Sequence, residues 1–217
     1  MASELYVLST TGSNITQYVD LRTAGAKLAG AISIPSSVTR SLGAAVDAYG
    51  DLYVSGSNSD NIVVLNIGGG LVETLTKDKS AFPFTSAGPL AIHGRDIYAG
   101  FGPQPGTNAV ISYNVGEFLT GDPKEITLYN DGVDTGPTQV AFDSKGNVYI
   151  AEYYSGTAVK YAPGSGKTPT LVINQGTSTC EGIALDKDGN IYVANSALNN
   201  ITVYSPSGGG LFAPSTS

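Results

Sequence analysis

One motif occurs five times along this sequence, at intervals of about 45 residues. In four copies a run of small apolar residues is followed by a polar turn with glycine and then by an apolar–Tyr–apolar run, as in VAFDSKGNVYIA. The first copy, ELYVLS, has only the second run. A repeat of this length restricts the chain to folds that stack copies of one small unit. The tyrosines at the centre of the five copies are Tyr6, Tyr53, Tyr98, Tyr149 and Tyr192.

Each repeat predicts β-strands, because its runs are short, β-branched and aromatic, with polar turns between them. Three copies carry Asp-x-x-Gly between the first two runs, at Asp47, Asp143 and Asp186. The carboxylate can accept backbone N–H groups of a turn, and glycine adopts the positive φ that a hairpin needs. A third run opens with Asn or Thr after most of the tyrosines, and a fourth run ends most repeats. Four strands in about 45 residues is typical of a β-propeller blade.

The predicted fold is therefore all-β, a β-propeller that forms a single domain over residues 1–217. The first repeat lacks its first strand, and the last repeat has room for a fourth strand at 210–213. We favour a closed ring of five blades, with one blade of three strands. A fragment or relative of a six-bladed propeller and an open ring completed by another chain remain alternatives. The motif tyrosines are predicted to pack between neighbouring sheets. The repeats cover about 4–40, 41–86, 87–136, 137–179 and 180–217.

The composition excludes several other classes of protein. Hydrophobic residues make up 41% of the chain and charged residues 13%, which argues against general disorder and against a coiled coil. The formal net charge of −7 argues against a nucleic-acid partner, and no apolar run is long enough to span a membrane. Cys180 is the single cysteine, so no intramolecular disulfide forms.

The amino terminus has no basic segment followed by an apolar run. We expect a secreted or cell-envelope protein whose signal peptide is absent from this sequence, with a cytoplasmic location as the alternative.

The segments VAFDSKGNVYIAEYYSGTAVKYAPG and IALDKDGNIYVANSALNNITVYSPSG resemble NHL repeats. They are similar to bacterial repeat proteins related to streptogramin lyases and gluconolactonase-like lactonases. The resemblance extends from Leu5 to about Ser207 and implies a β-propeller, usually of six blades. It implies function less closely, because most such proteins bind proteins, nucleic acids or small ligands and a minority are metal-dependent enzymes.

Three polar residues are predicted at one mouth of the propeller channel, where the second strand of a blade ends and the first begins. Glu152 and Glu181 belong to adjacent repeats, and Asn195 falls between them in register. Two carboxylates and an amide oxygen suit Ca²⁺, Mg²⁺ or Mn²⁺, and the glutamates could instead act as a catalytic acid/base pair. The resemblance implies a divalent metal held by such side chains. Alternatively, both glutamates are solvated residues without a catalytic role.

Aromatic residues beside these carboxylates suggest a contact surface. Tyr153 and Tyr154 follow Glu152, and Phe101 holds the corresponding place in the third repeat. With Asn195 they are candidate ligand-binding residues, although local packing would also explain a tyrosine pair.

The sequence favours a ligand- or protein-binding module that acts through one face or the channel mouth. Its partner would be a small molecule, a glycan or a protein. The alternative is a metal-dependent hydrolase of the lactonase type, so whether the protein is an enzyme stays open. We expect a monomer, or a dimer if the ring is open.

Overall fold

A computed structural model describes most of the 217-residue chain. The described residues are 4–8, 14–19, 27–38, 40–56, 61–66, 68–76, 87–94, 96–101, 109–114, 126–129, 136–163, 165, 168–174, 177–206 and 212–214. The chain divides into two compact units, Met1–Ile92 and His93–Ser217, called unit 1 and unit 2 below. That the chain forms one domain stays a prediction.

Every regular element in the described residues is a strand, so the all-β prediction is confirmed. The first sheet contains β1 (Glu4–Leu8), β2 (Asn14–Val19) and β3 (Lys27–Ser33). The second contains β4 (Ser41–Val46), β5 (Leu52–Gly56), β6 (Asn61–Leu65) and β7 (Leu71–Thr76). The third contains β8 (Ala87–His93), β9 (Asp96–Phe101), β10 (Ala109–Asn114) and β11 (Ile126–Tyr129).

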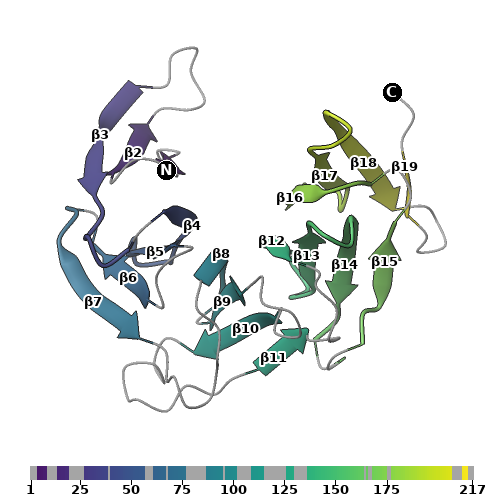
Figure 1. The fold of residues 1–217 in the computed structure, drawn as a ribbon, viewed down its shortest axis with the longest axis horizontal. Coiled ribbons are helices and arrows are strands. Elements are labelled where there is room, and N and C mark those ends of the chain that lie inside the picture. Colours follow the sequence, from purple (N-terminus) through teal and green to yellow (C-terminus); the bar gives the residue numbers. More distant parts are fainter. Residues whose placement is uncertain are drawn as a thin grey trace. The chain divides into compact units, whose positions relative to one another are not determined.

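The fourth sheet contains β12 (Pro137–Phe142), β13 (Val148–Glu152), β14 (Thr157–Tyr161) and β15 (Leu171–Ile173). The fifth contains β16 (Cys180–Leu185), β17 (Ile191–Asn195), β18 (Asn200–Pro206) and β19 (Phe212–Pro214). In all five sheets the strands lie side by side in chain order (Figure 1). One sheet of three strands and four sheets of four, as the repeats predict, account for the described strands. The number of blades stays a prediction. No helix among the described residues is long and apolar enough to cross a membrane.

Aspartate organises the hairpin between the first two strands of three sheets. In the fourth sheet, Asp143 Oδ1 accepts the backbone N–H groups of Lys145 and Asn147, at 2.9 and 3.0 Å. Asp143 Oδ2 accepts the side-chain amide of Asn147 at 2.6 Å and the hydroxyl of Tyr149 at 3.2 Å. Gly146 has a φ of 77°, so the predicted roles of aspartate and glycine are confirmed. The same backbone and tyrosine contacts surround Asp47 and Asp186.

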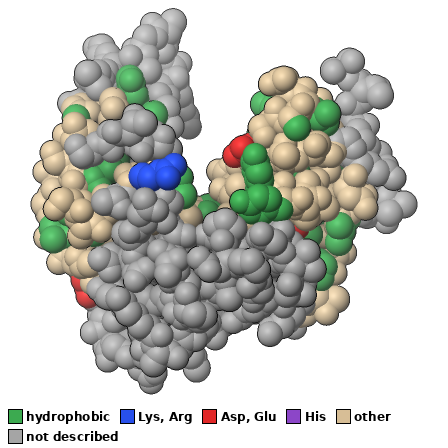
Figure 2. Space-filling view, in the orientation of Figure 1, with side chains coloured by type: hydrophobic (Ala, Val, Ile, Leu, Met, Phe, Trp, Pro, Cys, Tyr) green, Lys and Arg blue, Asp and Glu red, His purple; other side chains and the backbone are tan. Residues whose placement is uncertain are grey.

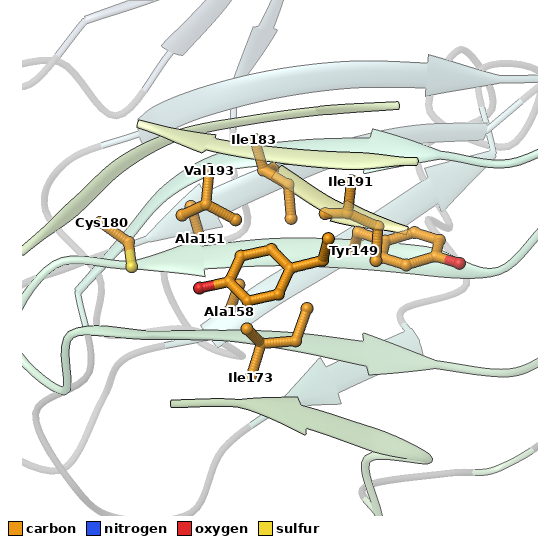
Figure 3. Packing of buried hydrophobic residues seen from close by; sticks show 9 residues of the cluster. Tyr149, Ala151, Ala158, Ile173, Cys180, Ile183, Ile191 and Val193 are labelled. Carbon is orange, nitrogen blue, oxygen red and sulfur yellow. The ribbon is translucent and has the colours of Figure 1, made fainter. Parts of the chain in front are cut away.

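The core of each unit lies between neighbouring sheets. In unit 2, Tyr149 and Ala151 of the fourth sheet pack with Ile183 and Val193 of the fifth (Figure 3). Tyr149 is 3% exposed, which confirms its predicted packing between sheets. Burial raises the pKa of its hydroxyl above the ordinary value, and the Asp143 carboxylate raises it further. In unit 1, a second cluster joins the first two sheets through Ile15, Ile32, Ile34, Val38, Leu52, Val54, Val63 and Leu65.

Candidate functional site

A β-bulge opens the first strand of three sheets, at the end away from the aspartate hairpins. In the fifth sheet the pairing register shifts between Cys180 and Gly182, so Glu181 is the extra residue. The residue two positions before Glu181, Thr179, has a φ of 46°, in the left-handed region. Both features recur where β4 and β12 begin, and these strand ends are called the bulged ends below. Their left-handed residues are Arg40 and Gly136, and their extra residues are Leu42 and Thr138.

Glu152 and Asn195 each end a strand that pairs with the bulged end of its own sheet, and that Asn195 falls between Glu152 and Glu181 in register stays a prediction. Pro137 pairs with Glu152 in the fourth sheet, and Cys180 pairs with Asn195 in the fifth. Thr138 links the two sheets, because its hydroxyl donates to the Cys180 carbonyl at 2.7 Å. The ends of β13 and β17 are therefore held next to the bulged ends of β12 and β16.

Glu152 is buried and holds a turn in place. Its side chain is 2% exposed, and Oε2 accepts hydrogen bonds from Ser155 Oγ at 2.8 Å and Thr157 Oγ1 at 2.5 Å. Ser155 lies in the turn that joins β13 to β14, and Thr157 is the first residue of β14. The carboxylate therefore fixes the turn at 153–156, which carries Tyr153 and Tyr154.

Asn195 is also buried, at 2% exposure, and its side-chain amide forms hydrogen bonds with neighbouring residues of the protein. Oδ1 accepts the Ser178 N–H at 3.1 Å, and Nδ2 donates to Asn200 Oδ1 at 3.1 Å and to Thr202 Oγ1 at 3.0 Å. The thiol of Cys180 also donates to Oδ1, over 3.8 Å. Burial raises the pKa of this thiol to about 11, and the Glu152 carboxylate adds to the rise.

Glu181 differs from the other two predicted ligands because it is exposed. Within the described residues its carboxylate accepts no hydrogen bond and forms no ion pair. It lines an open depression of about 480 Å³ whose accessible wall is mostly carbon. Figure 2 shows an acidic side chain beside hydrophobic ones in the region where Figure 1 places β12 and β16. The other residues around the depression are Ala194, Asn195, Ser196, Asn199, Asn200 and Ile201.

The tyrosine pair lies on the adjoining turn. The rings of Tyr153 and Tyr154 meet edge to face with centroids 5.2 Å apart, and Tyr154 is 56% exposed. Its ring rests on the backbone of Gly136, where an added Cβ would come within 2.5 Å of it. Phe101 ends β9, but its side chain lies outside the described residues.

Thr179 connects the tyrosine turn to the depression. The turn approaches it through Gly156, whose position for a Cβ is 3.3 Å from the Thr179 nitrogen. On its other side, Thr179 Oγ1 accepts the Ala197 N–H at 2.8 Å and bonds with Ser196 Oγ at 3.0 Å. These contacts connect the tyrosine turn and the depression into one surface. It is called the loop surface below and comprises residues 153–156, 178–179 and 196–201 together with Glu181.

The sequence predicted Glu181, Tyr153 and Tyr154 in this region but missed Thr179, Ser196, Asn199 and Ile201. One signal was present for Thr179, because it aligns with Gly136, and a glycine before a strand often marks a left-handed residue. For Ser196, Asn199 and Ile201 we find none.

The three predicted metal ligands differ in their availability. Glu152 and Asn195 are buried and bonded to neighbouring side chains or backbone, whereas Glu181 is open. No group of three or more His, Cys, Asp or Glu residues in the described part of the chain is placed to hold a metal ion. A Ca²⁺, Mg²⁺ or Mn²⁺ site therefore stays a prediction.

Comparison with solved structures shows that the fold is a β-propeller. A protein of unknown function from Bacteroides caccae superposes with a TM-score of 0.71 at 11% identity, over 100% of this chain and 74% of its own. Virginiamycin B lyase from Staphylococcus aureus superposes with a TM-score of 0.69 at 14% identity, and the match covers 98% of this chain and 66% of the lyase. The periplasmic gluconolactonase of Pseudomonas aeruginosa superposes with a TM-score of 0.66 at 15% identity, and the match covers 97% of this chain and 68% of the gluconolactonase.

No protein-family model and no curated protein matches the sequence. The superpositions on the lyase and the gluconolactonase confirm the predicted resemblance to such propellers at the level of the fold. At sequence identities this low, a shared fold does not show a shared activity.

Proposed function

We propose that this chain is a protein-binding β-propeller module that recognises a peptide segment of its partner on the loop surface. The observation that carries the proposal is the exposure of large apolar side chains there: Tyr154 at 56%, Leu198 at 48% and Ile201 at 65%. Exposed aromatic and aliphatic side chains with a polar rim are typical of protein interfaces. The turn contacts of Glu152 and Thr179 hold the surface in advance of binding, which lowers the entropy cost of association.

A matched pair of tyrosines tests the proposal. Tyr154 lies on the loop surface, whereas Tyr49 is 89% exposed on a hairpin turn of unit 1 between two aspartates. Peptides selected from a random phage-displayed library should bind Tyr154→Ala at least about tenfold more weakly than the wild type. Tyr49→Ala should bind them normally.

Two results would overturn this proposal. One is a library that yields no peptide of measurable affinity. The other is a glycan array on which the wild type binds defined sugars and loses them in Tyr154→Ala, since the loop surface would then recognise carbohydrate.

A metal-dependent hydrolase of the lactonase type is a second candidate. The observation in its favour is that a buried carboxylate, a buried thiol and a buried amide meet where β13 and β17 end, at Glu152, Cys180 and Asn195. A bound metal ion would raise the melting temperature by mass action. No change at millimolar Ca²⁺ or Mn²⁺ would count against this candidate, as would lactone hydrolysis that survives in both Glu152→Gln and Glu181→Gln.

A further inference from the structure

The depression on the loop surface combines one negative charge with an apolar wall, and this combination deepens the proposed function, on which the following rests. The Glu181 carboxylate is exposed and has no partner among the described residues. Beside it lie the methyl group of Ala194 and the side chain of Ile201, which is 65% exposed. A ligand that satisfies both features carries a positive group on an apolar stem.

The charges of unit 2 are distributed to favour such a ligand. The lysines that the structure describes there are at the hairpin ends of their sheets: Lys145 and Lys187 are in hairpin turns, and Lys160 lies over the Tyr149 ring, 5.4 Å from its centroid. Lys187 also pairs with Asp188 at 2.7 Å. No described lysine therefore neutralises Glu181. The overall charge of −7 adds to the attraction for a cation.

The backbone around the depression is held in an unusual conformation. Thr179 and Asn199 have φ values of 46° and 51°, and they are two of the three residues other than glycine with positive φ in the described chain. Such a conformation is unfavourable for residues other than glycine and tends to cluster at functional sites. It is secured here by the hydrogen bonds that Thr179 Oγ1 accepts from the Ser196 hydroxyl and the Ala197 N–H. Together with the bulge at Glu181, these contacts fix the depression before a ligand arrives.

We propose that the depression receives a lysine side chain of the partner peptide, with its ammonium group against the Glu181 carboxylate and its methylene stem against Ile201 and Ala194. Lysine fits better than arginine, because its charge is compact and its stem is a straight apolar chain. Arginine would use its planar fork best against several aligned acceptors, whereas the depression offers one carboxylate.

A double-mutant cycle tests this pairing. Library-selected peptides should contain lysine, and replacing that lysine by acetyl-lysine should weaken binding to the wild type about tenfold. Glu181→Gln should weaken binding of the unmodified peptide by a similar factor and should cause no further loss with the acetylated peptide. Asp188→Asn removes one carboxylate from the hairpin end of the same sheet and should leave binding unchanged. Added salt should weaken wild-type binding more than Glu181→Gln binding.

The outcomes separate this inference from the proposed function. If peptides bind, depend on Tyr154 and are unaffected by Glu181→Gln, the lysine pocket is wrong and the protein-binding surface stands. Equal losses from Glu181→Gln with unmodified and acetylated peptides would also overturn the lysine pocket. If no peptide binds, the proposed function itself fails.

Discussion

The two ends of the sheets differ in how closely the repeats match one another. At the hairpin ends, Asp47, Asp143 and Asp186 each accept the same two backbone N–H groups and the same tyrosine hydroxyl. At the bulged ends the backbone repeats but the side chains do not. The extra residue of the bulge is Leu42, Thr138 or Glu181 in the three sheets.

This difference indicates that the two ends of the repeat have different roles. A network that recurs with the same side chains has the same structural role in each sheet, which is to close a hairpin. A backbone that recurs with different side chains keeps the same fold and changes the side chains at the surface. The loop surface lies at the bulged ends, so we expect substitutions of the aspartate network to act alike at the three hairpin ends and binding substitutions to act only on the loop surface.

The largest loss of stability should come from a glycine at a bulged end. An added Cβ at Gly43 would lie 2.5 Å from the Gly88 carbonyl oxygen and 2.7 Å from the Leu90 nitrogen, both backbone atoms. Gly43→Ala should lower the free energy of unfolding by about 3 kcal/mol, as measured by urea denaturation. Gly30→Ala is the matched control, because a Cβ there meets nothing within 4 Å. Equal stability of the two variants would show that the bulged-end backbone is not fixed.

A smaller loss should follow when a hairpin-end network is removed. Asp143→Ala leaves the amide groups of Asn147 and the hydroxyl of Tyr149 without their acceptor, so we expect a loss of about 2 kcal/mol in urea denaturation. Lys145→Ala changes an exposed side chain in the same turn and keeps the backbone bond, so it should cost less than about 0.5 kcal/mol. If both substitutions cost the same, the aspartate does not organise the turn.

The same two ends explain what could be predicted from sequence. The Asp143 network lies within seven consecutive residues, Asp143–Tyr149, so its spacing is visible in the sequence. Contacts at the bulged ends join distant residues: Gln139 Oε1 accepts the N–H of Ile183, 44 positions away. The sequence placed Glu152 and Glu181 at the correct strand ends. It could not show that one is buried and the other exposed, because this depends on the neighbouring sheet and on a bulge that no local motif marks.

The smallest expected effect is a change in acid stability at the hairpin end of the fifth sheet. Hydrogen bonds from Asn190, foremost its side-chain amide, outweigh desolvation and hold the pKa of Asp186 at about 2, below its ordinary value of 3.8. Since the folded state favours the ionised form, this contribution to stability is full above the ordinary pKa and is lost as the pH falls towards 2. Urea denaturation over a series of pH values from neutral to acid should show that the free energy of unfolding declines less steeply for Asp186→Asn than for the wild type.

Asp188→Asn is the control, because it removes a carboxylate from the same turn and leaves the Asp186 network intact, so its pH profile should follow the wild type. An Asp186→Asn profile parallel to the wild type would mean that the network does not favour the carboxylate, and the hairpin ends would then be held by their backbone bonds alone.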